Sequence, residues 1–351
     1  MSQFHKLTIK SLNKITDKAI AITFAIPEGL KDNFKFKAGQ YITLKTQIND
    51  TDTRRDYSIC STPKDADVTV GVKAVEGGTF SVYANSHLKV GDIIDVAEPK
   101  GRFIFEANEI KTRTIAAFAA GSGITPILSI AKTLLESEPF SNFILVYGNK
   151  TSADAMFMSD LLALKNIYGN RFHMHCIYSQ SREEDALFGR IEKSTVNLIV
   201  KNKYKGVTIE KFYLCGPEAM IHTVKDVLLE NNIKDHQILF ELFTASANNE
   251  ASTAESSYGQ TMVKVIVDDE AFEFEMSQDT SILDAALKKD IDAPYSCQGG
   301  ICSSCIARIT EGEATMRQNN ILTDSEVAEG LILTCQAHPT SSTIVVDYDD
   351  V

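Results

Sequence analysis

The spacing of hydrophobic positions changes twice along the chain, and these changes predict three structural segments. Short runs rich in Ile, Val, Thr, Phe and Tyr, separated by turn residues, fill the first segment up to about residue 107. Runs of this length and spacing predict an antiparallel β-barrel. Its predicted strands are Ala19–Ile26, Gln40–Thr46, Val68–Ala74 and Asp92–Ala97.

The second segment, from about residue 108 to 243, alternates apolar runs with stretches whose apolar residues recur at helical spacing. This alternation predicts an α/β domain with a parallel sheet. The predicted strands are Thr114–Ala120, Phe143–Tyr147, Phe172–Tyr178 and Lys211–Leu214. The predicted helices are Pro126–Leu135, Asp154–Leu164 and Glu218–Glu230.

A polar stretch separates the third segment from the rest. Residues 244–260 are small and polar apart from one tyrosine. Because they cannot bury enough surface to offset their ordering entropy, they predict a flexible linker. Beyond it, Met262–Val267 and Ala271–Met276 predict a hairpin, and Ser281–Leu287 predicts a short helix capped by Ser281 or Thr280. We therefore expect domains at 1–107, 108–243 and 261–351.

Composition restricts the compartment and the partners. The 351 residues suit two or three domains, and no apolar leader or membrane-length apolar run is present. Seven cysteines, an odd number, favour a reducing compartment, so we expect a cytoplasmic protein without membrane contact. The net charge of −12 is concentrated in residues 261–351, which hold 17 acidic and 5 basic residues. This acidity serves solubility or docking on a basic partner surface, and it argues against nucleic acid.

Four cysteines near the C-terminus give the most specific chemical signal. Three are spaced C-x4-C-x2-C, and the fourth follows after 29 intervening residues. That is the ligand spacing of a plant-type [2Fe–2S] cluster. Zinc and disulfides are the alternatives, but zinc sites usually show a second Cys or His pair and disulfides suit secreted chains. The predicted cluster ligands are Cys297, Cys302, Cys305 and Cys335.

Two turns in the α/β segment follow predicted strands and precede predicted helices. The first is Gly121-Ser122-Gly123-Ile124-Thr125-Pro126, which could bring a pyrophosphate to the N–H groups of a helix N-terminus or be an ordinary tight turn. The second is Cys215-Gly216-Pro217, at the sheet edge where ligands bind in such folds. Its alternative is a structural turn with a buried thiol.

The barrel segment carries two further candidate motifs. Arg54-Arg55-Asp56-Tyr57-Ser58-Ile59 combines a phosphate-binding arginine, an aromatic ring and a hydroxyl, which could hold a flavin. The alternative is an exposed charged turn followed by a strand. Gly77-Gly78-Thr79-Phe80-Ser81 is a glycine turn with hydroxyls, suited to a pyrophosphate.

In this order, these motifs make residues 1–243 resemble the ferredoxin–NADP⁺ reductase superfamily, a flavin barrel followed by a nicotinamide domain. Gly39-Gln40-Tyr41 and Phe240-Glu241-Leu242-Phe243 add to the resemblance. Residues 261–351 resemble a plant-type ferredoxin, which implies an α+β (β-grasp) domain. The whole order is similar to that of the reductase subunits of phenylacetyl-CoA epoxidase complexes and their relatives.

The resemblance implies roles for the motif residues. Arg55 would contact flavin phosphate, Tyr57 would stack on the isoalloxazine, and Ser58 would bond near N5, with Ile59 beside them. Gly78, Thr79 and Ser81 would hold the flavin pyrophosphate. Cys215 would lie near the nicotinamide, and Phe243 would cover the flavin until the nicotinamide displaces it. The nicotinamide nucleotide would also contact Gly121, Ser122, Gly123, Thr125, Gly216 and Pro217.

Two cofactor choices remain open between close alternatives. Lys150, Ser179, Ser181 and Arg182 suit the 2′-phosphate of NADPH, although the acidic residues 183–185 beside Arg182 would equally suit NADH. NADPH is the expected donor. The Gly77–Ser81 turn favours FAD over FMN.

These features predict an NAD(P)H-dependent oxidoreductase. The expected electron path runs from NADPH through FAD and [2Fe–2S] to a partner protein, with the protein supplying orientation and tuning. The expected acceptor is a di-iron oxygenase acting on an aryl-CoA thioester. The alternatives are another acceptor, such as a desaturase, a hydroxylase or a hybrid-cluster protein, and a redox-sensing module without turnover.

Overall fold

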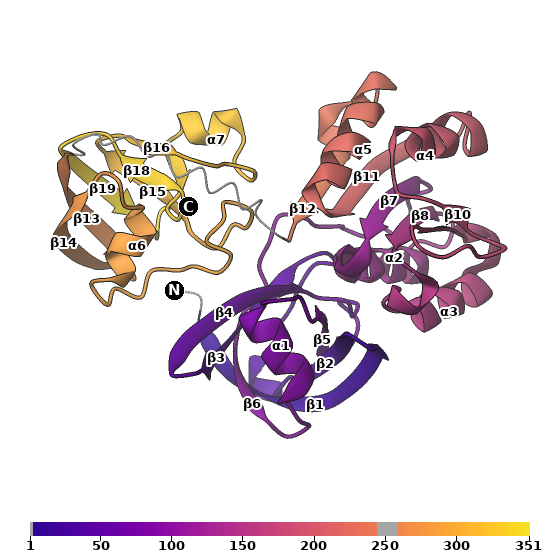
Figure 1. Ribbon diagram of the computed structural model, residues 1–351, viewed down its shortest axis with the longest axis horizontal. Helices are drawn as coiled ribbons and strands as arrows, with labels where there is room; N and C mark the ends of the chain where they lie inside the picture. The colour runs from indigo at the N-terminus through magenta and orange to yellow at the C-terminus, as the bar shows by residue number, and fades with distance from the viewer. Residues whose placement is uncertain (1–2, 244–258) are drawn as a thin grey trace. The chain divides into compact units, whose positions relative to one another are not determined.

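The structure is a computed structural model that describes residues 3–243 and 259–351 (Figure 1). The chain forms two compact units, one of residues Phe4–Phe243 and one containing the C-terminal residues through Val351. Most of the predicted linker, residues 244–258, lies outside the described residues, and Gln260 already begins a strand. Within the described ranges, no helix has the length and apolar content needed to cross a membrane.

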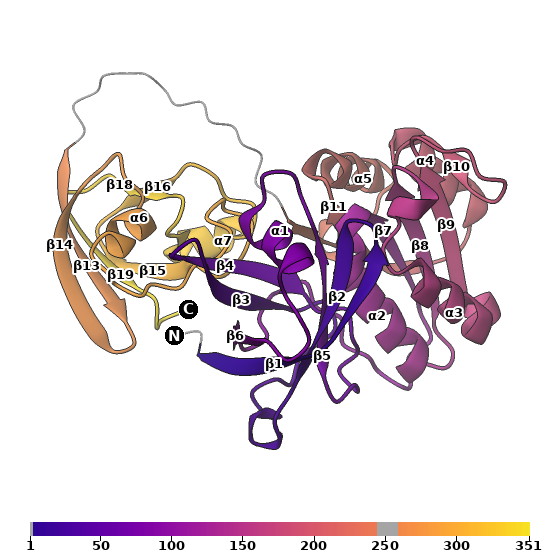
Figure 2. The ribbon, with the colours of Figure 1, turned by 60° about the horizontal axis from the view of Figure 1, so that its bottom comes forward.

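A six-stranded antiparallel sheet forms the first half of the Phe4–Phe243 unit, in the order β4-β3-β6-β1-β2-β5 (Figure 2). A bridge between Ile59 and Val70 joins the end of β4 to β5 and closes the sheet into the predicted barrel. The elements are β1 (Phe4–Thr16), β2 (Ala19–Ala25), β3 (Tyr41–Ile48), β4 (Thr51–Ser58), β5 (Val68–Lys73), α1 (Thr79–Ser86) and β6 (Ile93–Ala97).

Strand β4 forms although its sequence is mostly charged and polar. Its eight residues pair with all of β3, from Tyr41 opposite Ser58 to Ile48 opposite Thr51. Asn49 and Asp50 between the strands both have positive φ, 52° and 60°, as a two-residue hairpin turn requires. The turn geometry and the pairing therefore place Arg55, Tyr57 and Ser58 at the end of a barrel strand.

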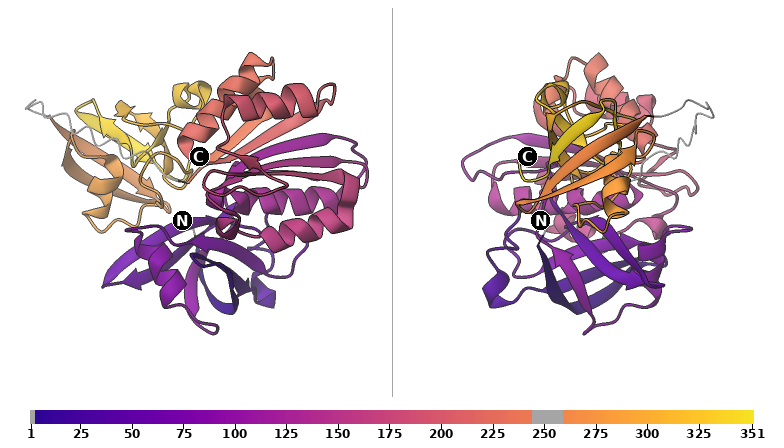
Figure 3. Two further views of the ribbon diagram at one scale, coloured as in Figure 1. Left: turned by 45° about the vertical axis from the view of Figure 1, so that its right-hand side comes forward. Right: turned by 90° about the vertical axis from the view of Figure 1, so that its left-hand side faces the viewer.

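The second half of this unit is a parallel sheet in the order β10-β9-β8-β7-β11-β12. The strands are β7 (Thr114–Ala120), β8 (Asn142–Asn149), β9 (Phe172–Tyr178), β10 (Leu187–Phe188), β11 (Ile209–Gly216) and β12 (Ile238–Leu242). The helices are α2 (Ile124–Ser137), α3 (Met158–Tyr168), α4 (Lys193–Asn197) and α5 (Glu218–Glu230). They cover both faces of the sheet, as the left view of Figure 3 shows.

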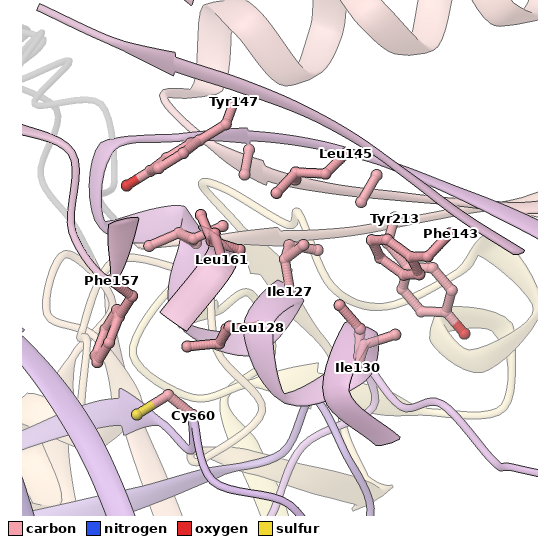
Figure 4. Packing of buried hydrophobic residues seen from close by; sticks show 14 of the residues in the cluster. Cys60, Ile127, Leu128, Ile130, Phe143, Leu145, Tyr147, Phe157, Leu161 and Tyr213 are labelled. Atoms are coloured by element: carbon pink, nitrogen blue, oxygen red, sulfur yellow. The ribbon is translucent and has the colours of Figure 1, made fainter. Parts of the chain in front are cut away.

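A buried apolar cluster joins the barrel to α2 and the sheet (Figure 4). Cys60, just after β4, lies beneath α2 near Leu128 and Phe157. The Ser129 hydroxyl of α2 donates to the carbonyl of Ser61 at 2.6 Å, in a fully buried position. The two halves of the unit are therefore held by packing and a hydrogen bond, and the ends of their strands can build one site.

The C-terminal unit has a five-stranded mixed sheet, ordered β14-β13-β19-β15-β17, and a two-stranded sheet of β16 and β18. Asp268 and Asp269 turn the predicted hairpin with positive φ, and Ser281 caps α6 by accepting the Asp284 N–H at 3.1 Å. The bounds are β13 (Gln260–Val267), β14 (Glu270–Ser277), α6 (Ile282–Leu287), β15 (Ile306–Glu311), β16 (Ala314–Met316), α7 (Asp324–Ala328), β17 (Leu331–Leu333), β18 (Ala337–Pro339) and β19 (Thr343–Asp347).

Candidate functional site

The carboxyl ends of the parallel strands gather the predicted nicotinamide residues at one sheet edge. From β7, the strand order runs through β8 and β9 on one side and through β11 on the other. The turns after β7 and β11 therefore flank the point where the order reverses, which is where ligands bind in open α/β sheets. Gly121 and Gly216 lie at these two strand ends.

Close approach to β11 restricts the turn after β7. A Cβ on Gly123 would lie 2.1 Å from the carbonyl oxygen of Cys215, so only glycine fits there. Gly121 has φ +56°, and the nearest atom to a Cβ built on it is Lys73 Nζ, at 3.7 Å. The Thr125 hydroxyl donates back to the Ser122 carbonyl at 3.0 Å, which holds the turn closed.

Strand β4 meets the same edge through one hydrogen bond. The Ser58 hydroxyl donates to Glu241 Oε2 at 3.1 Å, although 183 residues separate the two in sequence. Glu241 lies on β12 and pairs with Cys215 of β11. The predicted flavin residue Ser58 and the predicted nicotinamide residue Cys215 therefore lie on either side of one carboxyl group.

Burial sets the protonation of this group. Glu241 as a residue is only partly buried, but burial of its carboxyl raises the pKa of that group to about 8. The Ser58 hydrogen bond opposes this rise, and the charge of Asp56 adds to it. The Cys215 thiol is fully buried, and burial followed by the charge of Glu241 raises its pKa. Both groups are therefore neutral at pH 7.

The remaining residues of the β4 motif point in different directions. Tyr57 packs against Phe80 with ring centroids 5.5 Å apart, and burial raises its pKa. Arg55 is exposed, and its guanidinium donates to the carbonyl of Arg54 at 2.6 Å. Ile59 is fully buried in the barrel core, and its N–H is bonded to the Gln40 carbonyl. The Ile59 side chain therefore serves barrel closure, a role that the motif alone did not indicate.

The second glycine turn leads directly into α1. Gly77 has φ +72° with no atom within 4 Å of a built Cβ, and Gly78 occupies the N-cap position without a side-chain cap. Thr79 is exposed at the first helical position, whereas Ser81 is buried and accepts the Val75 N–H at 3.3 Å. An uncapped helix N-terminus offers free N–H groups to an anion, so the turn fits a phosphate group.

The predicted 2′-phosphate residues lie after β8 and β9. Ser179 donates its N–H to the Asn149 carbonyl at 3.0 Å, and Lys150 is exposed beside it. The Arg182 guanidinium lies over the Phe188 ring, 4.4 Å from its centroid. Glu183 instead accepts the Ser152 hydroxyl at 2.8 Å.

Buried polar side-chain atoms at this edge lack hydrogen-bond partners among the described residues. The Ser181 hydroxyl is buried and has no hydrogen-bond partner among the described residues. Buried polar groups are normally satisfied. A bound nucleotide phosphate would supply the missing partner, so the chemistry of this corner fits the expected group.

Lys73 is a further residue at this edge that the sequence motifs did not include. It ends β5, and its Nζ reaches the Gly121 turn. Burial lowers its pKa, and the charge of Asp154 opposes that effect. The sequence did hold a signal for Lys73, since this lysine lies at the end of a barrel strand, shortly before the Gly77–Ser81 turn. Phe240 and Phe243 end the unit, and Phe243 packs against the buried cluster from a partly exposed position.

Two of the four predicted cluster cysteines in the C-terminal unit lie in contact with each other. The Cys305 and Cys335 thiols are hydrogen-bonded to each other, which raises the pKa of Cys305 and lowers that of Cys335, and Cys297 lies within electrostatic reach of both. Gly300, with φ +70°, and Gln298, with φ +53°, shape the loop around them. No three such side chains in the described residues converge on one metal-ion position. A [2Fe–2S] cluster would take two thiolates at each of its two irons, so its four ligands need not converge on one metal position. The four cysteines therefore fit such a cluster.

Three successive segments of the chain match known protein families. Residues 6–105 match the oxidoreductase FAD-binding domain, residues 118–226 the oxidoreductase NAD-binding domain, and residues 265–340 the 2Fe-2S iron-sulfur cluster binding domain. The ferredoxin–NADP⁺ reductase-like architecture with a C-terminal ferredoxin domain is therefore confirmed, and the chain is an NAD(P)H oxidoreductase.

Three relatives extend the match over the whole chain. One of the subunits of 1,2-phenylacetyl-CoA epoxidase from Escherichia coli is 38% identical over 99% of both chains. The ferredoxin reductase component of 3-ketosteroid-9-alpha-monooxygenase from Mycobacterium tuberculosis is 29% identical over 98% of this chain and 96% of its own. The structure of phthalate dioxygenase reductase, 25% identical, covers 98% of both chains with a TM-score of 0.63. The chain thus belongs to the family of FAD- and [2Fe–2S]-containing NAD(P)H oxidoreductases that includes this component of 1,2-phenylacetyl-CoA epoxidase.

Proposed function

We propose that this protein is an NADPH-dependent reductase that delivers single electrons to a cytoplasmic oxygenase. The observation that carries the proposal is the Ser58–Glu241 hydrogen bond, which joins the flavin-side strand β4 to the nicotinamide-side edge of the sheet. When bound between the residues of β4 and the sheet edge, FAD would supply the conversion of a two-electron hydride donor into single electrons for the cluster. The chain's own residues hold, orient and shield these groups.

On the flavin side, the roles that we propose for the residues of β4 and α1 rest on the exposure and the hydrogen bonds of their side chains. Arg55 offers an exposed guanidinium for phosphate, Tyr57 offers a ring beside Phe80, and the α1 N-terminus with Gly78 and Thr79 offers N–H groups to a pyrophosphate. Ser81 acts indirectly because its hydroxyl is bonded to the turn itself. Two phosphates require this second turn, which favours FAD over FMN.

On the nicotinamide side, the Gly121–Thr125 turn and Gly216–Pro217 would form the walls of the nucleotide site. Lys73 would pair with a phosphate group of the nucleotide. The reacting ring would approach Ser58 beside neutral Cys215 and Glu241, a role supported by the pairing of Cys215 with Glu241 and by the Ser58–Glu241 hydrogen bond. Phe243, which packs against the buried cluster at the end of the unit, would cover the flavin until the nicotinamide displaces it. A neutral, water-poor environment suits hydride transfer because it adds no charge beside the reacting carbon.

The preference for NADPH rests on Arg182. Its guanidinium stacks on Phe188 and has no ion pair among the described residues, so its charge remains available to a 2′-phosphate. Glu183 is tied to Ser152. Lys150, Ser179 and the unpartnered Ser181 hydroxyl add phosphate-binding groups.

Replacing Arg182 tests this preference. Arg182→Ala should raise the KM for NADPH about tenfold or more while leaving the KM for NADH unchanged, since one hydrogen-bonded charge contact contributes ~1.5–3 kcal/mol. Lys205→Ala, which removes an exposed cation elsewhere in the domain, is the control and should change neither. An equal change for both nucleotides would contradict the 2′-phosphate role.

The proposed acceptor is a di-iron oxygenase component acting on an aryl-CoA thioester, and the proposal is supported by the relative that shares 38% identity and is named as a subunit of 1,2-phenylacetyl-CoA epoxidase. The acidic C-terminal region, with 17 Asp and Glu against 5 Lys and Arg, supports docking on a basic acceptor surface.

Cluster removal tests the electron path. Cys302→Ala should abolish reduction of cytochrome c but spare reduction of ferricyanide, which can accept electrons directly from the flavin. Cys176→Ala, a thiol of the nicotinamide domain, is the matched control and should retain both activities. Equal loss of both activities in Cys302→Ala would refute the path, and wild-type protein without any turnover would support a redox sensor instead.

A different oxygenase is the second candidate acceptor. Relatives that span most of this chain are named as reductase components of a 3-ketosteroid monooxygenase and of a glycine betaine monooxygenase. Affinity capture with the full chain from its native cells separates the two. Recovery of aryl-CoA epoxidase components supports the first candidate, and recovery of another oxygenase supports the second.

A further inference from the structure

A cavity of about 250 Å³ lies where the barrel meets the last turns of α2. Both of its walls belong to the Phe4–Phe243 unit, one to the barrel half and one to the α/β half. Since α2 rises ~1.5 Å per residue from Ile124, the cavity residue Thr133 lies ~13 Å along the helix from the Gly121 turn. The cavity is therefore separate from the sheet edge that gathers the expected nucleotide residues.

The barrel side of the cavity is apolar and aromatic. Ala38 and Phe105 form an antiparallel bridge, in which the Phe105 N–H donates to the Ala38 carbonyl at 2.9 Å, and both side chains are buried. Phe36, which is partly buried, lines the same side. An apolar cavity of ~150 Å³ holds benzene, and sites for drug-sized ligands begin at ~300 Å³. The volume and the two rings therefore suit a ligand with one aromatic ring and a short chain.

The α2 side of the cavity is polar. Thr133, Glu136 and Ser137 are spaced at i, i+3 and i+4, so they lie on one face of the helix. The Thr133 hydroxyl is buried and has no hydrogen-bond partner among the described residues. Glu136 forms no ion pair in the same part of the chain. A hydroxyl oxygen and a carboxylate both accept hydrogen bonds, so this face suits a ligand group with several N–H donors.

The charges around the cavity favour a cation over an anion. Lys37 forms an ion pair with Glu106, so these two lining charges cancel. The other two lining charges are Lys64 and Glu136, both exposed. Burial of its carboxyl raises the pKa of Glu136, and Asp65 adds to the rise while nearby lysines oppose it. A carboxylate that is partly desolvated and repelled by another gains more from a bound cation than the hydrated Lys64 gains from an anion.

The same end of α2 already holds one cationic group. Arg171 donates to the carbonyls of Leu135 and Glu138, at 2.9 and 2.8 Å. The carbonyl groups at the C-terminus of a helix form its negative end, which favours positive charge. An ammonium group beside Thr133 and Glu136 would lie in the same field.

We propose that this cavity binds a small organic cation that carries one aromatic ring and an ammonium group. The ring lies against Phe36, Ala38 and Phe105, and the three N–H donors of the ammonium group reach Thr133 and Glu136. Because the walls come from both halves of the unit, the bound ligand also joins the barrel to the nicotinamide domain. Its binding stabilises the unit against unfolding and does not displace the nucleotide.

Calorimetric titration of the full-length protein with phenethylammonium chloride tests the site. Binding should saturate at one ligand per chain, and saturating NADP⁺ should leave the affinity unchanged. The neutral 2-phenylethanol and the anionic 3-phenylpropionate carry the same ring. Both should bind at least about tenfold more weakly, because neither offers a charged N–H donor to the carboxylate.

Substitutions at the cavity separate charge from shape. Glu136→Gln keeps the shape and should weaken phenethylammonium binding about tenfold or more. Lys64→Gln removes a repelling charge and should strengthen binding, whereas Thr133→Val removes the hydroxyl and should weaken binding. Glu109→Gln is the control, since Glu109 is exposed and lies outside the cavity lining, and it should bind as the wild type does.

Absence of saturable phenethylammonium binding by the wild-type protein would overturn the proposal. Wild-type affinity in Glu136→Gln would do the same, as would loss of binding in the presence of NADP⁺. Tighter binding of 3-phenylpropionate would assign the cavity to an anion at Lys64 and contradict the proposed cation. Because Glu136 is exposed, its substitution should not impair folding, so this variant decides even if Thr133→Val is unstable.

Discussion

At the scale of single residues, Glu241 is a carboxyl whose protonation departs far from its ordinary chemistry. Its sequence context marked only the end of a domain, because a glutamate between apolar residues has no evident partner. The structure places it between Ser58 and Cys215. Such a contact depends on how two domains pack, so local sequence could not predict it. By contrast, the cysteine spacing predicted a [2Fe–2S] domain, which the family match of residues 265–340 confirms, because the spacing of cluster cysteines is a local property of the sequence.

The raised pKa of Glu241 predicts a pH-dependent contribution to stability. The pKa rises from 4.5 when the carboxyl is free to about 8 in the folded protein, so folding favours the protonated form. This contribution is complete below about pH 4.5 and is lost as pH rises to about 8. Within that window, the free energy of unfolding should fall by about 1.4 kcal/mol per pH unit from this group alone.

Glu241→Gln removes this dependence. Denaturant unfolding between pH 5 and pH 8 should show the variant gaining on the wild type by about 1 kcal/mol per pH unit, and the gain should level off above pH 8. Glu184→Gln, at an exposed position in the same unit, should run parallel to the wild type. Parallel curves for Glu241→Gln would show that the carboxyl is already ionised at neutral pH.

At the scale of elements, apolar periodicity predicted the buried strands and helices closely but missed strands whose sequences are polar. Predicted Phe172–Tyr178 and Glu218–Glu230 coincide with β9 and α5. Strand β4 is held by pairing with β3 and by its turn, so it shows no alternation of apolar residues. Ion pairs that join elements were equally invisible, since their partners are far apart in sequence.

The buried pair of Arg113 and Glu138 is the most consequential of these ion pairs. Arg113 Nη2 lies 2.6 Å from Glu138 Oε1, and the two side chains are 7% and 0% exposed. Arg113 also reaches Glu210 at 2.7 Å, which ties β7 to β11. Both carboxyls have lowered pKa values: burial opposes the shift, and hydrogen bonds from Arg113 drive it.

Removing one member of this pair should be costly. Arg113→Met leaves the Glu138 charge buried without its partner, and it should lower the free energy of unfolding of the Phe4–Phe243 unit by about 3–5 kcal/mol. The double variant Arg113→Met/Glu138→Leu should recover part of that loss. Lys193→Met breaks an exposed pair with Glu230 and should cost less than about 1 kcal/mol. Urea titration measures all three, and a double variant that is less stable than Arg113→Met would contradict the coupling.

At the scale of the whole molecule, the uneven charge distribution supports the proposed exit of electrons through the C-terminal region. Composition alone showed that the excess acidity belongs to residues 261–351, and the family match places the [2Fe–2S] domain there. The region that carries the cluster is thus also the region suited to a basic acceptor. The sequence could predict this charge distribution because a charge count does not depend on which residues are in contact.

Ionic strength should therefore act on electron delivery. Reduction of cytochrome c, a basic acceptor, should slow by at least several-fold between ~0.02 M and ~0.3 M salt, because screening shortens the range of attraction from about 20 Å to about 6 Å. Reduction of ferricyanide, an anion, should not slow in this way. Cytochrome c rates that are independent of salt would contradict docking through the acidic region.

Anaerobic stopped-flow reduction by NADPH, with flavin and cluster absorption followed separately, is the sharpest test of the proposed electron path. Flavin absorption should bleach first, and cluster absorption should fall in a later phase. In Cys302→Ala, the flavin phase should remain and the cluster phase should vanish. Cluster bleaching that precedes flavin bleaching, or a cluster that NADPH never reduces, would contradict the proposed path through the Ser58–Glu241 junction to the cysteines of the C-terminal unit.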